Sequence, residues 1–218
     1  PPEGLVGLRG IRADGGVYVV DASYRMPGMR PPLTVDDYKE RHIPGAVFLD
    51  IDVVADRDNA LPHMLPQPAI FAREIGMLGI GHDDLVVIYD RGDYMGAPRA
   101  WWMFGVFGHQ RVKVLDGGLK KWLADGHPVN AEAVSPAAKT YRTDFDETRV
   151  RRIDQMTRNV ETREEQVIDA RSRERFEGSA PEPWQGRRSG RIPGSLNVPF
   201  NELFDPSTGL MKHVAELR

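Results

Sequence analysis

The groups of this 218-residue chain that could do chemistry are charged side chains, because the sequence contains no cysteine. The polypeptide as given therefore has no disulfide, no thiolate metal ligand and no thiol nucleophile. A carboxylate and an imidazole, Asp52 in "FLDID" and His63 in "PHMLP", stand 11 residues apart, and such a pair can move protons. Arg175 carries a guanidinium that suits an anion. Taken alone, all three are typical of solvated surface charge.

The composition narrows the classes of function. The net charge is −3, from 29 basic and 32 acidic residues, so nothing favours a nucleic-acid partner or a membrane surface. No apolar run approaches the roughly 18 residues of a spanning helix. The six histidines show no metal-ligand spacing, and "DGG" at 116–118 lacks the glycine pattern of a dinucleotide site. We expect neither a metal nor a cofactor.

The elements that would position these groups alternate between strands and helices. Apolar, β-branched runs predict strands, amphipathic stretches that end at glycine predict helices, and their alternation predicts an α/β unit with a mainly parallel sheet. After it, a stretch rich in Ala, Ser, Pro and Thr reads as a linker, and a helix at 153–162 and a strand at 165–171 restart the pattern. Strands are expected within 17–23, 45–52, 84–90 and 112–118, and helices within 33–42, 67–81, 100–108 and 119–126.

The chain also repeats a phrase. "ERHIPGAVF" begins at Glu40 and "SGRIPGSLN" begins at Ser189. "VYVVDAS" precedes the first copy and "EQVIDAR" the second. The aspartate of the upstream strand lies 22 residues before the isoleucine in the first copy (21 to 43) and 23 in the second (169 to 192). This long period indicates a duplicated domain rather than a solenoid.

The second copy is shorter than the first. In the first, 86 residues run from Ile43 to the end of the unit at Val129, whereas only 26 residues follow Ile192. We therefore expect that about 60 residues of a second domain lie beyond Arg218, by the logic of repeats. A half sheet would leave unpaired edges and apolar faces.

The motifs of the chain resemble those of two-domain rhodaneses, over nearly the whole length and in the right order. The resemblance implies tandem rhodanese-like α/β domains, each a mainly parallel sheet flanked by helices, with the second incomplete. It places domain 1 at 1–130, a linker at 131–152 and the front of domain 2 at 153–218. The motifs are "DAS", "ERHIPGAVFLDID", "PHMLP", "VVIYDRG", "APRAWWMFGVFGH", "VLDGGLKKWLADGHPV", "VIDARSRERFEG", "PEPW", "SGRIPGSLNVPF" and "FDPSTGLM".

This resemblance implies a sulfurtransferase. In such proteins a cysteine of the second domain takes a sulfane sulfur as a persulfide and passes it to a thiol, to cyanide or to a thioredoxin-like protein. The cysteine loop follows the second-domain counterpart of "LVVIYD", which the repeat places near position ~239. The first domain carries Asp90 at the equivalent place. We expect this polypeptide to be inactive alone, for want of the nucleophile.

The resemblance also implies a sulfur donor and the residues that bind it. Enzymes that use 3-mercaptopyruvate share Asp52 and His63, which act with a serine of the cysteine loop on the protons of the substrate. Arg175 matches the arginine that binds the substrate anion, and Tyr94 is a candidate to line the cleft. Where many relatives carry a second arginine, this chain has Trp184. Two neighbours in the same loop are candidates to replace that arginine, Arg187 and Arg188.

Two alternatives stay open. A thiosulfate-preferring enzyme would carry a "CRKG"-like loop beyond position 218, whereas a "CGSG"-like loop would favour mercaptopyruvate. A non-catalytic rhodanese-like binding module would carry no cysteine there. The expected partners are a small-molecule sulfur donor and a thiol acceptor, and the expected compartment is the cytoplasm, or the mitochondrion in a eukaryote.

Overall fold

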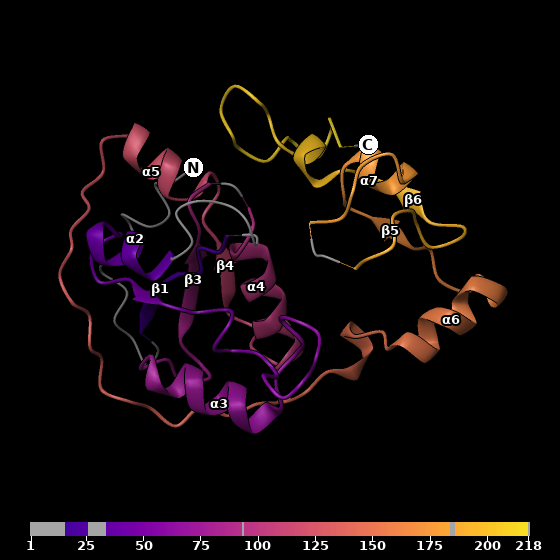
Figure 1. The fold of residues 1–218 in the computed structure, drawn as a ribbon. Coiled ribbons are helices and arrows are strands. Elements are labelled where there is room, and N and C mark those ends of the chain that lie inside the picture. The colour runs from indigo at the N-terminus through magenta and orange to yellow at the C-terminus, as the bar shows by residue number, and fades with distance from the viewer. Residues whose placement is uncertain (1–15, 26–33, 93, 184–185, 218) are drawn as a thin grey trace. The chain divides into compact units, whose positions relative to one another are not determined.

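The structure, a computed structural model, describes residues 16–25, 34–92, 94–183 and 186–217. The chain forms two compact units. Unit 1 contains the described residues up to 147, and unit 2 those from 148 to 217 (Figure 1). No helix in these residues is long and apolar enough to cross a membrane.

Unit 1 is built on a four-stranded parallel sheet with the strand order β2-β1-β3-β4. In the central pair, Val17 to Asp21 lie opposite Leu85 to Tyr89, residue for residue. Helices connect the strands, which confirms the predicted α/β class with a mainly parallel sheet. The elements are β1 (Val17–Asp21), α2 (Thr34–Glu40), β2 (Val47–Phe48), α3 (Pro68–Met77), β3 (Leu85–Tyr89), α4 (Ala97–Val106), β4 (Val112–Val114) and α5 (Gly118–Ala124).

The sheet is covered on both faces. Along β3, Val86 and Ile88 point into one hydrophobic cluster, and Val87 and Tyr89 point into another. Neighbouring residues of a strand point to opposite faces, so an unbroken apolar run such as "LVVIY" requires cover on both sides.

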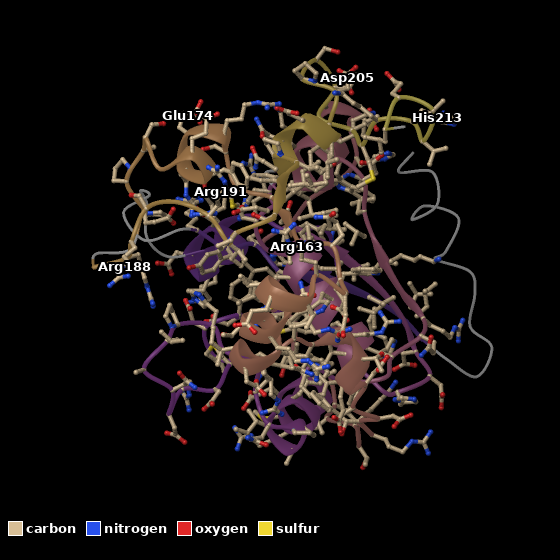
Figure 2. The ribbon with its side chains drawn as sticks, turned by 90° about the vertical axis from the view of Figure 1, so that its right-hand side faces the viewer. Arg163, Glu174, Arg188, Arg191, Asp205 and His213 are labelled. Carbon is tan, nitrogen blue, oxygen red and sulfur yellow. The ribbon has the colours of Figure 1, made fainter. Side chains whose placement is uncertain are left out.

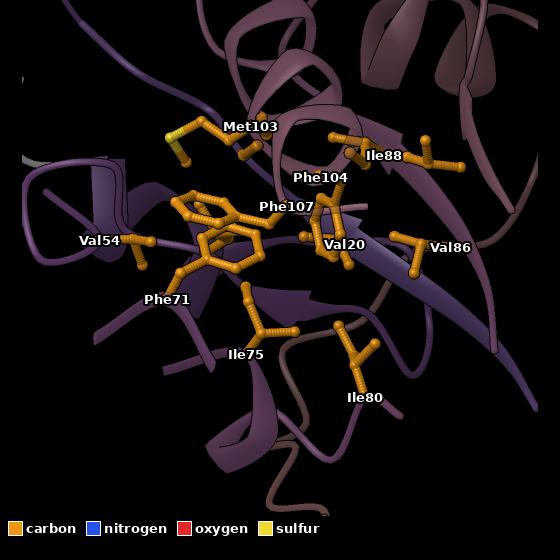
Figure 3. Packing of buried hydrophobic residues seen from close by; sticks show 14 of the residues in the cluster. Val20, Val54, Phe71, Ile75, Ile80, Val86, Ile88, Met103, Phe104 and Phe107 are labelled. Carbon is orange, nitrogen blue, oxygen red and sulfur yellow. The ribbon is translucent and has the colours of Figure 1, made fainter. Parts of the chain in front are cut away.

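The larger cluster lies between the sheet and the helices α3 and α4. Its centre is aromatic: the rings of Phe71 and Phe107 stack with centroids 4.1 Å apart, and Phe104 meets Phe71 edge to face at 5.5 Å (Figure 3). All three side chains are fully buried. The smaller cluster on the other face is formed by residues that include Ile43, Leu119 and Trp122. These packed faces hold the ends of the strands, and the loops that follow them, in place.

The segment expected to be a linker from residue 131 is part of unit 1 up to residue 147. Lys139 donates its backbone N–H to the carbonyl of Gly76 and its Nζ to Asp84 at 2.7 Å. Tyr141 is buried against Phe71. The backbones approach so closely that a Cβ at Gly76 would lie 2.4 Å from the Lys139 oxygen. We call residues 131–147 the strap. Its composition shows that the segment is polar but does not show on which surface it packs.

Unit 2 contains two short parallel strands, with Ile168 opposite Leu196. Among its described residues Pro199 is buried but no larger hydrophobic side chain is, and Ile168 and Leu196 are more than half exposed. Polar contacts therefore hold much of this unit. Its elements are α6 (Ile153–Thr162), β5 (Ile168–Asp169), α7 (Arg173–Glu177), β6 (Leu196–Asn197) and the 3-10 turn η2 (Phe200–Leu203); a further turn, η1 (Glu147–Arg149), lies where the units join in sequence.

The repeated Ile-Pro-Gly phrase forms the same turn in both units. Ala46 donates its N–H to the carbonyl of Ile43 at 2.9 Å, and Ser195 donates to Ile192 at 3.1 Å. The glycine of each turn has a positive φ, 78° in the first and 79° in the second. An L side chain rarely adopts this conformation, so the glycine is required in both copies.

Candidate functional site

The structure joins Asp52 and His63. Both lie in the long loop between β2 and α3, and the buried side chains of Ile51 and Val54 on either side of Asp52 fix that part of the loop to the core. His63 Nε2 lies 2.5 Å from Asp52 Oδ1. The imidazole is 21% exposed and the carboxylate 66%. The pair is therefore a charge-assisted hydrogen bond at the surface of unit 1.

This contact determines what the imidazole can do. A carboxylate oxygen accepts hydrogen bonds, so His63 Nε2 must carry the proton. In the neutral ring Nδ1 then keeps its lone pair and is the atom that can take a proton from a substrate. Asp52 orients the ring through this hydrogen bond, which is the arrangement that an acidic residue and a histidine adopt in a catalytic triad. This arrangement has the geometry that a general base with an orienting carboxylate requires.

Tyr24, which the sequence reasoning missed, forms part of the same site. Its ring meets that of His63 edge to face, with centroids 5.0 Å apart. Burial, and to a lesser degree the charge of Asp52, raises the pKa of the Tyr24 hydroxyl, which keeps it protonated. The available signal was its place just after β1, since ligands of parallel sheets bind at the carboxyl ends of the strands.

In the loop after β3, side chains of the loop form hydrogen bonds with its own backbone. Asp90, at the place equivalent to the expected cysteine, is buried and accepts backbone N–H groups from Gly92 at 2.9 Å and Ala97 at 3.1 Å. Tyr94, a predicted substrate-binding residue, donates its hydroxyl to Asp116 and accepts the N–H of Gly117. The Tyr94 hydroxyl is thus engaged within unit 1.

In unit 2, Arg175 belongs to a partly buried network of charges. Its Nη2 donates to Glu182 Oε2 at 2.6 Å, and Arg171 Nη1 donates to Glu182 Oε1 at 2.7 Å. Arg171 also donates through Nε to Asp169 at 2.9 Å. The Glu182 side chain is only 8% exposed. Hydrogen bonds from Arg175 in the first place hold the pKa of Glu182 below its usual range, although burial opposes them.

This network orients Arg175 and leaves it one donor group. Within the part of the chain that the structure describes, its Nη1 makes no hydrogen bond, so an anion can bind there without breaking the contact with Glu182. A guanidinium fixed on one side by a carboxylate is pre-organised for a second anion on the other. Taken alone, the sequence showed an arginine between acidic residues, and the resemblance to the family made Arg175 a candidate to bind the substrate anion.

The other predicted arginines lie on the surface of unit 2. Arg187 and Arg188 are exposed, and Arg188 projects from its loop (Figure 2). Arg191 packs over the ring of Phe176 at 4.9 Å. Trp184 lies outside the described residues. The structure thus brings Asp52 and His63 together in unit 1 and presents Arg175, Arg187 and Arg188 separately in unit 2.

Comparisons with known proteins agree with this fold. The rhodanese-like domain family matches residues 11–125. Thiosulfate sulfurtransferase of Gallus gallus is 42% identical over 214 residues, which are 97% of this chain and 72% of that protein. The 3-mercaptopyruvate sulfurtransferase of Homo sapiens is 41% identical over 213 residues, 97% of this chain and 71% of that protein.

A solved structure shows the same similarity. SseA from Escherichia coli, whose structure is described among the 3-mercaptopyruvate sulfotransferases, superposes with a TM-score of 0.84 at 36% identity, over 94% of this chain and 76% of that one. The chain therefore belongs to the rhodanese-like sulfurtransferases. The fold and the family predicted from the sequence motifs are confirmed.

Proposed function

We propose that this chain is the greater part of an enzyme that moves sulfane sulfur from 3-mercaptopyruvate to a thiol or to cyanide. A cysteine carried beyond residue 218 would hold the sulfur as a persulfide. The observation that supports this donor is the hydrogen-bonded pair of Asp52 and His63. Its chemistry is proton transfer, and 3-mercaptopyruvate is the donor that needs it.

The transfer balances as follows. The cysteine thiolate attacks the sulfur of the mercaptopyruvate thiol and forms an S–S bond. The C–S bond breaks, its electron pair passes to carbon as the enolate of pyruvate, and the enzyme is left as a persulfide. His63 is our candidate to take the proton of the mercaptopyruvate thiol and to return it to the enolate through a serine of the cysteine loop, which gives pyruvate and leaves the persulfide as an anion. An acceptor thiolate or cyanide then attacks the outer sulfur and releases the cysteine thiolate.

Arg175 is our candidate for the substrate carboxylate. Its guanidinium is fixed by hydrogen bonds to Glu182, and its Nη1 makes no hydrogen bond with the other residues that the structure describes. A single anchored guanidinium forms a strong contact with a carboxylate, and Arg187, Arg188 or Tyr94 would supply any second contact.

Thiosulfate is the second candidate donor. Relatives named for it are as similar to this chain as one named for 3-mercaptopyruvate, at 42% and 41% identity. Sulfite leaves thiosulfate as a stable anion that needs no proton, so the Asp52–His63 pair would have no work to do in that reaction. The third alternative, a non-catalytic binding module, is less well supported, because these relatives are named as sulfurtransferases.

We further propose a thiol acceptor such as a thioredoxin-like protein, and a cytoplasmic or mitochondrial location. Alone, this polypeptide should form no persulfide, since it holds no cysteine. Incubation of the chain with mercaptopyruvate and cyanide should give no thiocyanate above a heat-treated control. A segment that carries the cysteine loop, supplied as a separate polypeptide, should restore turnover.

The donor is tested in the longer protein, which contains this chain and the cysteine loop. We expect kcat/KM for 3-mercaptopyruvate to be higher than kcat/KM for thiosulfate. A preference for thiosulfate would reject the proposed donor and leave the family assignment unchanged.

A further inference from the structure

Arg99 contacts the histidine of the Asp52–His63 pair through that residue's backbone carbonyl. It is the third residue of α4, in the motif "APRAWW", and its guanidinium stacks over the ring of Trp102 at 4.7 Å. Its Nη2 donates to the carbonyl oxygen of His63 at 2.6 Å. A helix that packs on the sheet thus contacts the loop that carries the candidate base.

The charge of Arg99 is costly to bury. Desolvation lowers the pKa of its guanidinium, and no described carboxylate forms an ion pair with it. Its Nε–H is buried and has no hydrogen-bond partner. A hydrocarbon side chain of similar length would fill the same space without this penalty, because an unpaired buried charge is unfavourable. Besides its stacking on Trp102, the one hydrogen bond that the guanidinium makes within the described residues is the one to His63.

His63 has a backbone that needs support. Its φ is +58°, a left-handed conformation that is uncommon outside glycine, although histidine adopts it more often than most other residues, as asparagine and aspartate do. Rotation of this residue out of that conformation would carry its imidazole away from Asp52. The hydrogen bond from Arg99 holds the carbonyl of the same residue, while Asp52 holds the ring nitrogen and Tyr24 packs against the ring.

We propose that Arg99 is a positioning residue of this site, which holds the left-handed peptide of His63 so that the imidazole stays on Asp52. The inference rests on the proposed function of His63 as a base and adds to it a residue that touches no substrate. The stacking of Arg99 on Trp102 lies within α4, so it is the hydrogen bond to His63 that would set Arg99 apart from a residue that merely stabilises the helix.

The first test measures the geometry in this chain and needs no cysteine. In the wild type, NMR should show contacts between the rings of Tyr24 and His63, assigned by comparison with His63→Gln. Arg99→Met should remove these contacts, whereas Arg99→Lys, which keeps one charged donor, should retain part of them. The matched control is Arg111→Met, since Arg111 also donates to a backbone carbonyl, that of Asp83, and lies away from His63. Unchanged Tyr24–His63 contacts in a folded Arg99→Met chain would overturn the proposal.

The second test is a double-mutant cycle in the longer protein that carries the cysteine loop. Arg99→Met should lower mercaptopyruvate turnover about tenfold, the effect of one hydrogen bond from a charged donor, and should leave thiosulfate turnover nearly unchanged. In a His63→Ala background the same substitution should have almost no further effect. A tenfold loss that persists in that background would show that Arg99 acts on the fold and not through His63. If Arg99→Met does not fold, Arg99→Lys carries the same cycle with a smaller effect.

The two tests separate this inference from the proposed function. If His63→Ala leaves the donor preference unchanged, the proposed function fails, but the Tyr24–His63 contacts still decide whether Arg99 positions His63. If the contacts and the cycle fail while His63→Ala shows the donor-specific loss, only the role of Arg99 is rejected.

Discussion

Replacing His63 by alanine removes the group that the proposed reaction uses to move a proton. In the complete enzyme, mercaptopyruvate turnover should fall by about 10²–10⁴-fold, the usual effect of lost acid–base catalysis. Thiosulfate turnover should change far less, because sulfite needs no proton to leave. The His63 ring is hydrogen-bonded to Asp52 and packs against Tyr24, and neither contact is part of the buried hydrophobic core of unit 1. The fold should therefore survive the substitution.

The structure also sets the size of the effect at Asp52. Its side chain is 66% exposed, so solvent screens its hydrogen bond to His63 and reduces it to about 1 kcal/mol. Asparagine keeps an oxygen that can accept the Nε2–H and loses only the charge. Asp52→Asn should then lower mercaptopyruvate turnover by at most about fivefold, since 1.36 kcal/mol corresponds to a factor of ten and the substitution removes only part of the ~1 kcal/mol.

The assay is thiocyanate formation from each donor with cyanide in excess, measured for kcat and KM separately. His127→Ala is the matched control, because His127 is another histidine of unit 1 that packs against Trp122 and has no contact with Asp52. Equal losses on both donors in His63→Ala would refute the reasoning, since His63 would then support the fold or the shared sulfur-transfer step. A larger loss in Asp52→Asn than in His63→Ala would refute the assigned roles.

Three further outcomes are expected. Arg175→Ala should lower kcat/KM for mercaptopyruvate by a factor that corresponds to about 2–4 kcal/mol of transition-state stabilisation, and Arg175→Lys should restore only part of it. Wild-type kinetics in Arg175→Ala would remove Arg175 from the site. Burial raises the pKa of Asp84, but hydrogen bonds from Lys139 and two backbone amides outweigh it and leave the pKa below its usual value. The stabilisation from Asp84 is thus present above pH ~4 and lost as the pH falls through the lowered value, so chemical denaturation should show a steep acid loss that Asp84→Asn flattens. Gly76→Ala should destabilise the chain by about 1–3 kcal/mol, because the new Cβ would overlap the oxygen of Lys139; an unchanged denaturation midpoint would show that the strap moves aside freely.

Local patterns in the sequence determined much of this protein. The unbroken run "LVVIY" predicted a strand buried on both faces, and β3 indeed points alternate side chains into two cores. The repeated Ile-Pro-Gly phrase indicated a duplicated domain, and both copies form a turn with an equivalent hydrogen bond and a positive φ at glycine. These features depend on residues that are neighbours in the chain, so the sequence contains them directly.

Only the tertiary structure decided which distant charges meet. Composition predicted a linker from residue 131, but Lys139 reaches Asp84 and Tyr141 enters the core, so the segment up to 147 belongs to unit 1. The pairing of Arg175 with Glu182 and the contact of Arg99 with the carbonyl of His63 left no pattern in the sequence. Charged side chains are long and have many rotamers, and their partners depend on how loops and helices pack. A hydrophobic pattern specifies that packing only for the apolar faces.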